Sequence, residues 1–258
     1  MIHVIPKVVH YCWFGGKPKP AEVERYLANW RSVLPDYEIR EWNEQNFGIS
    51  AWPYAVQAME AGKFAFVSDV ARLHALYAVG GIYLDTDVEL RRTFDDLLAN
   101  DVVLGFEEGN YVATSTMLAR PGSRLMGAFL QTYVGRDFRR NDGWLDETTN
   151  VQVLTSLLEE HGLNRDGSAQ DLQWGDEQIR VLVRTALSPI DYPNGIDHSN
   201  AQTYAVHHFG QSWAGPALRI KTKLRKMVIG LIGGGRLKRM RYFLSKFKSK
   251  ETDVSGGQ

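Results

Sequence analysis

The chain has 258 residues, of which 44% are hydrophobic and 23% charged, a balance typical of a soluble globular protein. Its single cysteine, Cys12, excludes an internal disulfide and fits a reducing compartment. The net charge is zero, but residues 219–250 hold twelve Lys and Arg and no acid, while the preceding residues carry a net charge of −10.

Strands and helices are predicted to alternate along most of the chain. The predicted strands are 7–13, 37–42, 82–85, 102–106, 112–118, 179–183 and 204–209, and the predicted helices are 21–34, 64–79 and 149–161. This alternation indicates an α/β domain with a mostly parallel sheet over residues 1–218. We expect the Gly80-Gly81 pair to end the second helix through a left-handed cap. Neither a signal peptide nor a membrane span is predicted.

Two acids follow the short apolar strand that ends near Leu84. Asp85 and Asp87 are spaced i, i+2, and side chains at this spacing on a strand project to the same side. Ligands of open α/β sheets bind beyond the carboxyl ends of the strands, and hard oxygen ligands suit Mg²⁺ or Mn²⁺. The alternative is a solvated turn or a helix N-cap with no ligand.

The helix predicted just before this strand carries Asp69 and Arg72 on one face, at i, i+3. They form either a surface ion pair of small energy or two contacts directed into a nucleotide pocket. His207 and His208 are adjacent in a predicted strand and must point to opposite faces, so at most one of them can join a metal site comfortably.

Four blocks of sequence in this order resemble a known family: residues 5–16 (IPKVVHYCWFGG), 30–43, 68–88 and 207–213. The chain is similar to the bacterial, capsular-polysaccharide-type branch of glycosyltransferase family 32, whose members have an Asp-x-Asp sugar-binding region. The resemblance implies a GT-A fold, which is a Rossmann-like α/β domain. It also implies a retaining transfer of a hexose from a nucleoside-diphosphate sugar, with Mn²⁺ or Mg²⁺ as cofactor.

The same resemblance implies roles for individual residues. Asp87 would be the direct metal ligand, Asp85 would hold the ribose, the sugar or a metal-bound water, and His208 would complete the metal shell. Asp69 and Arg72 would contact the ribose and donor sugar, and are implied with the two acids to be catalytic. The other residues implied to line the donor site are Tyr11, Trp13, Phe14, Ser212 and Trp213.

One block departs from the family pattern. Many members have Thr-Gly-Pro before a Val-Leu-Thr helix start, whereas this chain has Thr149-Asn150-Val151-Gln152. This segment faces the donor sugar and acceptor in related folds, so the choice of sugar is left open. Asn150 and Gln152 either supply polar contacts there or are only helix-start residues.

The basic region 219–250 fits two amphipathic helices separated by Gly233-Gly234-Gly235, followed by a disordered C-terminus at 251–258. We interpret it as a tail that binds an anionic membrane surface. The alternatives are helices that dock on the acidic body and an arm that binds nucleic acid. The last is disfavoured because no stacking aromatics interleave the charges, and nucleic acid is not expected as a partner.

The sequence thus predicts a metal-dependent transferase acting on a glycan or lipid-linked glycan acceptor in bacterial capsule or lipopolysaccharide synthesis. It would be cytoplasmic and peripheral on the inner face of the cell membrane. Two other classes stay open: a nucleotide-sugar-binding relative without turnover, and a metal-dependent phosphoryl hydrolase. The hydrolase would need more carboxylates converging on two ions than one strand end supplies.

Overall fold

The computed structural model describes residues 5–210, and the predicted tail and C-terminus (219–250 and 251–258) lie outside the described residues. The described residues divide into a main unit, 5–189 with 199–210, and a short segment, 190–198. The segment holds a hairpin of β9 (Ile190–Asp191) and β10 (Ile196–Asp197), closed by Asn194 against Asp191. The main unit holds all of the candidate site.

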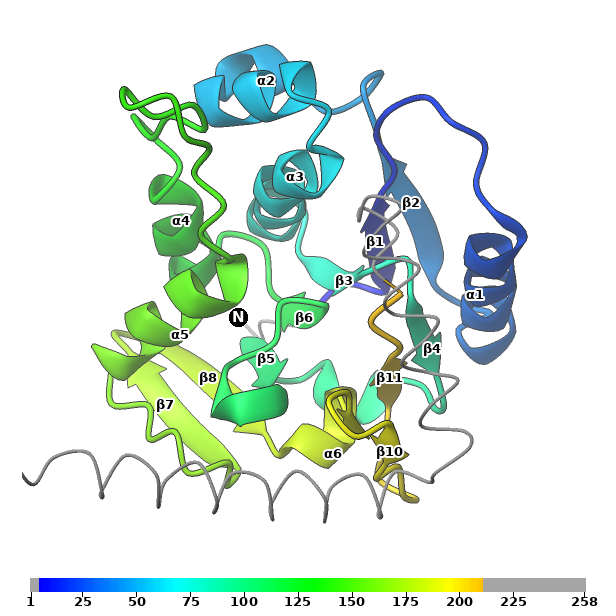
Figure 1. The fold of residues 1–258 in the computed structure, drawn as a ribbon. Helices are drawn as coiled ribbons and strands as arrows, with labels where there is room; N and C mark the ends of the chain where they lie inside the picture. Colours follow the sequence, from blue (N-terminus) through cyan, green and yellow to red (C-terminus); the bar gives the residue numbers. More distant parts are fainter. Residues whose placement is uncertain (1–4, 211–258) are drawn as a thin grey trace, which may run out of the picture. The chain divides into compact units, whose positions relative to one another are not determined.

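A seven-stranded sheet forms the centre of the main unit, in the order β2-β1-β3-β6-β5-β8-β7 (Figure 1). Its strands are β1 (Val8–Cys12), β2 (Glu38–Trp42), β3 (Gly81–Leu84), β5 (Val102–Gly105), β6 (Thr116–Ala119), β7 (Gln170–Trp174) and β8 (Glu177–Leu182). The pairings show that β6 and β7 run opposite to the other five strands. The prediction of an α/β domain with a mostly parallel sheet is therefore confirmed, with two reversed strands.

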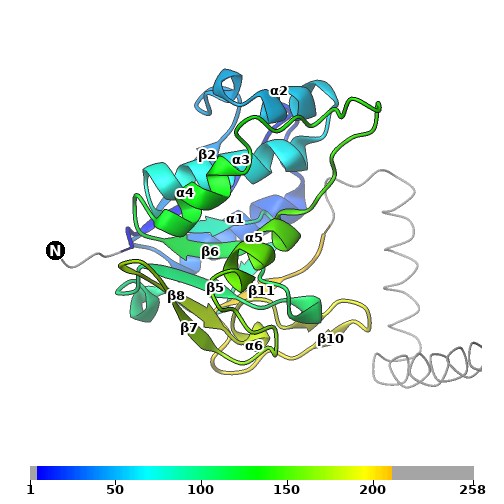
Figure 2. The ribbon, with the colours of Figure 1, turned by 90° about the vertical axis from the view of Figure 1, so that its left-hand side faces the viewer.

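Helices cover both faces of this sheet (Figures 1 and 2). The helices are α1 (Ala21–Val33), α2 (Pro53–Glu60), α3 (Phe64–Ala78), α4 (Arg124–Gln131), α5 (Asn150–Glu159) and α6 (Arg184–Leu187). Three single 3-10 turns lie at Ile49–Ala51, Asp95–Leu97 and Glu108–Asn110. Helices α2 to α5 pack on one face, while α1 and α6 pack on the other beside a two-stranded sheet of β4 (Val88–Leu90) and β11 (Ala205–His207). None of the helices in this part of the chain has the length and apolar character needed to cross a membrane.

The two faces bury separate cores because side chains alternate along each strand. In β3, Ile82 and Leu84 join the core under α1, whereas Tyr83 between them joins the core under α3. The larger core contains the apolar faces of α3 and α4. This alternation points the Tyr83 side chain toward α3, the helix that carries Asp69 and Arg72.

The turn from α3 into β3 has the predicted left-handed cap. Gly80 has φ +69° and donates its N–H to the carbonyl of Leu76 at 3.0 Å. A Cβ atom at this position would lie 2.5 Å from the Pro121 ring, so only glycine fits. The tight cap sends the chain directly from α3 into the central strand β3, which brings the two predicted site segments together.

Helices α2 and α4 and strands β4 and β7 are not among the predicted elements. The N-terminus of α4 is held by Glu177, which is fully buried at the start of β8. Its carboxylate accepts hydrogen bonds from the backbone N–H groups of Arg124 at 3.1 Å and Leu125 at 2.9 Å. The Ser123 hydroxyl accepts from the Met126 N–H at 3.2 Å. A carboxylate from a neighbouring strand thus satisfies the free donors of a helix start.

Replacing Glu177 with alanine is expected to lower the free energy of unfolding by about 3 kcal/mol, because it leaves buried donors without acceptors. Urea unfolding followed by circular dichroism measures this change. The matched control is Asp176→Ala, which removes the neighbouring exposed acid that pairs with Arg124 at the surface and should cost less than about 1 kcal/mol. Equal effects of the two substitutions would contradict this account.

Candidate active site

The two acids of the Asp-x-Asp motif lie in a turn between β3 and β4. The Val88 N–H donates to the Asp85 carbonyl at 3.0 Å, which closes the turn, and the Asp85 N–H donates to the Ser115 carbonyl at 2.8 Å. We expected the two acids to face one way because side chains alternate along a strand. Alternation does not apply here, because Asp87 lies in the turn and not in a strand. The turn itself brings the carboxylates together.

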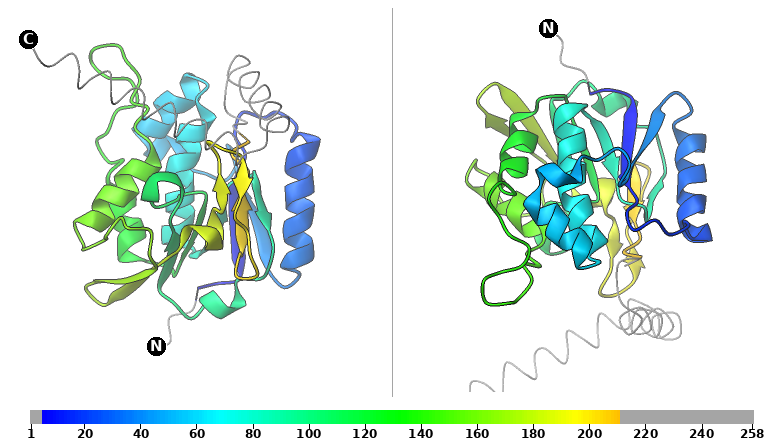
Figure 3. Two further views of the ribbon diagram at one scale, coloured as in Figure 1. Left: turned by 60° about the horizontal axis from the view of Figure 1, so that its bottom comes forward. Right: turned by 90° about the horizontal axis from the view of Figure 1, so that it is seen from above.

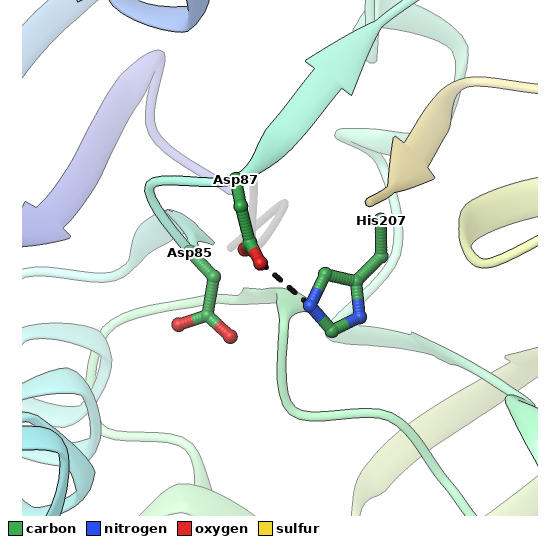
Figure 4. Close-up of side chains that lie close together, drawn as sticks. All are labelled: Asp85, Asp87 and His207. Carbon is green, nitrogen blue, oxygen red and sulfur yellow. Dashed lines mark ion pairs between the residues drawn. The ribbon is translucent and has the colours of Figure 1, made fainter. Parts of the chain in front are cut away.

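Strand β11 adds a histidine to this pair. It runs antiparallel to β4 with His207 opposite Val88, and His207 Nε2 lies 3.4 Å from Asp87 Oδ1. One ligand atom from each of Asp85, Asp87 and His207 lies within 4.8 Å of the others. Figure 4 shows the three side chains converging from the β3–β4 turn and from β11. The site is therefore assembled from segments far apart in the sequence.

The histidine that lies near the acids is His207. The family resemblance instead implied His208 as the metal ligand. His208 points away from the pair: its Nε2 lies 2.9 Å from Glu89 Oε2, and its ring stacks on Tyr26 at 5.4 Å. The β4–β11 register explains this, because His208 lies two residues after Val206, the partner of Glu89, and so shares its face. The expectation that the two histidines face opposite ways agrees with these contacts.

Helix α3 places Asp69 and Arg72 beside the acidic turn. Arg72 Nη2 lies 3.0 Å from Asp69 Oδ1 and 3.4 Å from Asp85 Oδ1, so one guanidinium contacts both acids. Its Nη1 donates to the Thr114 carbonyl at 2.8 Å, and its charge lies 4.6 Å from the centre of the Tyr83 ring. The Tyr83 hydroxyl donates to Asp85 Oδ1 at 2.9 Å. Arg72 is buried and not part of a surface ion pair, so its contacts fix the position of Asp85.

The charges of Asp87 and His207 stabilise each other. Burial raises the pKa of Asp87, but the His207 imidazolium and the Gly210 N–H lower it by more, so that the resulting pKa is about 2. Burial lowers the pKa of His207, but the Asp87 carboxylate raises it by more, so that the resulting pKa is about 9. The Gly210 N–H donates to Asp87 Oδ2 at 2.6 Å. At neutral pH and without a bound cation, the imidazolium is thus the positive partner of this acid, and a cation that binds His207 would have to displace its proton.

Burial raises the pKa of Asp69 to about 6. The Arg72 guanidinium lowers this pKa, and the Asp85 carboxylate raises it. Its side chain is 13% exposed. Because the folded-state pKa lies above the unfolded value, Asp69 contributes stability below about pH 4 that is lost as the pH rises through 6.

We therefore expect Asp69→Asn to unfold with a flatter pH dependence than the wild type. The free energy of unfolding of the variant should gain about 2 kcal/mol on the wild type between pH 4 and pH 7. Urea titrations at several pH values measure this difference. A wild-type stability that rises more steeply than that of Asp69→Asn over this range would contradict the prediction.

The three aromatic residues predicted to floor the nucleoside site do not form one surface. Tyr11 is buried in the core under α1 and donates its hydroxyl to Glu41 at 2.5 Å, whereas Phe14 is buried in the opposite core against Phe47. Trp13 is half-buried, and its indole N–H donates to the Lys17 carbonyl at 2.7 Å. Of the three side chains, the indole of Trp13 is the one left partly accessible to a ligand.

Asn150 and Gln152, predicted as polar contacts, have different environments at the start of α5. Asn150 is buried, accepts a hydrogen bond from the Tyr133 hydroxyl, and donates to the Asp69 carbonyl at 3.5 Å. Gln152 is exposed, with its side chain 3.3 Å from the Thr149 hydroxyl. Asn150 therefore supports the backbone of Asp69. Ser212 and Trp213 lie outside the described residues.

Sequence reasoning did not single out Tyr83, Thr114 or Glu107 at this site. Glu107 is half-buried in the loop after β5, where burial and the Asp85 carboxylate raise its pKa and His207 lowers it. The signal for Tyr83 was present, because its position between two residues of one core predicts that it faces the other. Thr114 acts through its backbone carbonyl, which no side-chain pattern reveals.

The chemistry of Asp85, Asp87 and His207 fits a divalent cation. Two carboxylates and one imidazole are ligands that Mn²⁺ accepts, and three protein ligands leave positions for a substrate. The buried Nδ1 of His207 has no hydrogen-bond partner among residues 5–210. Arg72 and Tyr83 hold Asp85, and the Gly210 N–H holds Asp87. Contacts of this kind orient metal ligands.

Comparison with known proteins finds a family match over part of the chain that includes the two acids. Residues 20–104 match the model described as a glycosyltransferase sugar-binding region containing a DXD motif. Inositol phosphoceramide mannosyltransferase 3 of Schizosaccharomyces pombe is 33% identical over 102 residues, which cover 36% of this chain and 27% of that protein. Subversion of eukaryotic traffic protein A of Legionella pneumophila is 22% identical over 249 aligned positions, covering 73% of this chain and 37% of its own length.

The chain thus spans well under half the length of these curated relatives. Among solved structures, PaToxG glycosyltransferase is similar with a TM-score of 0.50 and 17% identity, over 61% of this chain and 70% of that one. This likeness concerns the fold, and it confirms the predicted GT-A fold. The acidic turn and α3 both lie within residues 20–104, the part of the chain that matches this sugar-binding region, whereas His207 lies outside it.

Proposed function

We propose that this protein transfers a hexose from a nucleoside-diphosphate sugar to a glycan acceptor, with a divalent cation held by Asp85, Asp87 and His207. The observation that carries the proposal is the convergence of these three side chains within 4.8 Å in a domain with the glycosyltransferase fold. A buried arginine joins the metal site to Asp69 on α3. This pattern favours a site that binds a charged donor over a solvated turn.

The cation would supply Lewis-acid stabilisation of the charge that develops on the leaving diphosphate, worth several kcal/mol. The protein's own residues prepare the site for it. Arg72 and Tyr83 fix the Asp85 carboxylate, while the Gly210 N–H holds Asp87. Site rigidity of this kind reduces the reorganisation needed when the donor binds.

Asp69 would accept hydrogen bonds from donor hydroxyl groups. Its pKa of about 6 leaves it ionised at neutral pH, and its carboxylate is held by Arg72 Nη2 on one oxygen. Asn150 supports its backbone carbonyl. The half-exposed Trp13 indole is the aromatic group left to contact the nucleoside.

The finer parts of the proposal rest on resemblance and composition. Retention of the donor configuration and a role in bacterial surface polysaccharide synthesis follow from the family likeness. A hexose is supported by the mannosyltransferase named among the relatives, whose name also indicates a lipid acceptor. The basic composition of residues 219–250 supports placement at an anionic membrane surface, where a lipid-linked acceptor would be found.

The test is a thermal-shift screen of UDP- and GDP-hexoses with the full-length protein, with and without Mn²⁺, followed by assay of nucleotide release. We expect one donor to raise the melting temperature only when Mn²⁺ is present, and chelation to abolish nucleotide release until Mn²⁺ is restored. Release that persists in excess chelator, or no shift with any donor, would refute the proposal. Release that no saccharide acceptor accelerates would favour a hydrolase.

A further inference from the structure

The loop between α4 and α5, residues 132–149, displays an exposed tryptophan. Trp144 is 74% exposed, more than any other large hydrophobic residue in the part of the chain that the structure describes, with Val134 next at 57%. The residues before it, Arg139 to Gly143, are all exposed and mainly polar. A single indole among polar side chains is not the continuous apolar patch that marks a protein interface.

Hydrogen bonds within the loop hold the backbone of this tryptophan. The Gly143 N–H donates to the Arg140 carbonyl at 3.0 Å, and the Arg140 N–H donates to the Trp144 carbonyl at 2.8 Å. The Trp144 N–H donates to Asp142 Oδ1 at 3.0 Å. Both backbone polar groups of Trp144 are therefore occupied within the loop. A ligand that contacts the ring needs to order little of the loop, which favours affinity.

The base of the loop is anchored through Asp146. Its carboxylate accepts hydrogen bonds from Arg136 Nε at 2.7 Å and from Arg140 Nη2 at 3.2 Å. Burial raises the pKa of Asp146, but Arg136 and Thr148 lower it far below its usual value. The Tyr54 hydroxyl of α2 donates to the Asp146 carbonyl at 3.1 Å. The ion pairs of Asp146 therefore close the base of the loop, and the Tyr54 hydrogen bond holds this base against α2.

The loop is also connected to the candidate active site. Arg136 lies 5.2 Å from the centre of the Tyr133 ring, the Tyr133 hydroxyl donates to Asn150, and Asn150 donates to the Asp69 carbonyl. In Figure 2 and in the right-hand view of Figure 3, the green loop and the end of β11, the strand that carries His207, extend toward the same end of the domain. The loop that carries Trp144 thus extends toward the same end of the domain as the strand that supplies His207.

We propose that Trp144 is a binding platform on which a sugar ring of the acceptor glycan stacks; this inference rests on the proposed function. A pyranose ring has an apolar C–H face and a rim of hydroxyl groups. Stacking that face on an indole removes apolar surface from water and leaves the hydroxyls hydrated. Trp144 would set acceptor affinity, with no part in donor binding.

The test uses full-length Trp144→Ala and Trp144→Phe, with Val134→Ala as the matched control for loss of another exposed apolar side chain of the same loop. The acceptors are methyl glycosides of glucose, galactose and mannose and their disaccharides. We expect Trp144→Ala to raise the acceptor KM about tenfold or more, a loss typical of a buried tryptophan contact. Its donor hydrolysis without acceptor should stay within about twofold of the wild type, and Trp144→Phe should recover part of the affinity.

A second measurement does not depend on activity. The difference in fluorescence emission between wild type and Trp144→Phe isolates Trp144, and it should shift and saturate on titration with the saccharides that act as acceptors. An unchanged acceptor KM in Trp144→Ala overturns the inference, as does a difference signal that responds to anionic phosphatidylglycerol vesicles but to no saccharide. If the wild type releases nucleotide from no nucleotide sugar, with or without an acceptor, the proposed function fails, and the saccharide titration alone decides the role of Trp144.

Discussion

Asp87→Asn is expected to reduce sugar transfer about a thousandfold, and to remove the response of the remaining activity to Mn²⁺. The substitution keeps the shape of the side chain but removes the charge that His207 and Gly210 contact. A lost interaction of several kcal/mol with a bound cation corresponds to about three powers of ten in rate. Initial rates of nucleotide release over a range of Mn²⁺ concentrations measure both effects.

The matched control for this variant is Glu89→Gln, two residues further along the same segment. Glu89 contacts His208 and Arg91 and lies outside the group of three ligands. Its neutralisation should change the rate by no more than about twofold, and circular dichroism should show that both variants are folded. Full activity of Asp87→Asn, or an equal loss in Glu89→Gln, would rule out the role given to Asp87.

His207→Ala and His208→Ala are expected to behave very differently, although the two residues are adjacent. His207→Ala should weaken the apparent affinity for Mn²⁺ at least about 100-fold, because losing a group that only orients a ligand already costs about 10- to 100-fold. His208→Ala removes a contact with Glu89 and the stacking on Tyr26, so it should cost about 1 kcal/mol of stability and leave Mn²⁺ affinity unchanged.

Mn²⁺ activation curves for transfer, and direct titration of Mn²⁺ by electron paramagnetic resonance, measure the affinities of the two variants. The titration needs no donor or acceptor. If His208→Ala loses the metal and His207→Ala retains it, the assignment made from the β4–β11 register is wrong and the one implied by the family resemblance is right.

The comparison of these two histidines shows where sequence reasoning stops. Asp69, Arg72, Asp85 and Asp87 could be predicted to lie together because one short stretch of chain, α3 followed by β3, carries all four. The choice between His207 and His208 depends on their register against β4, a three-residue strand that was not predicted. Pairing between distant segments is set by packing, and a shift of one residue exchanges the two faces.

The elements missed in the fold have similar causes. Helix α4 starts after Ser123, a usable capping signal, but its eight residues are few for a hydrophobic period to identify. Strand β7 (Gln170–Trp174) lies at the edge of the sheet and is mostly polar, so it lacks the apolar alternation of an inner strand. The aromatic residues near the N-terminus look alike in sequence, yet Tyr11 in β1 and Phe14 beyond the end of β1 are buried in opposite cores.

The contacts of Arg72 limit what a substitution at this position can preserve. Its guanidinium donates from Nε to the Ser68 carbonyl at 3.4 Å and from Nη1 to Thr114, while Nη2 faces Asp69 and Asp85. All but one of its N–H groups therefore already have an acceptor inside the protein, and a bidentate grip on an incoming phosphate is beyond its remaining capacity. A lysine has fewer donors and no planar fork, so it would leave at least one of these acceptors unmatched. Arg72 is therefore better understood as a buried structural residue that connects α3 to the acidic turn, with a geometry that no other cationic side chain reproduces.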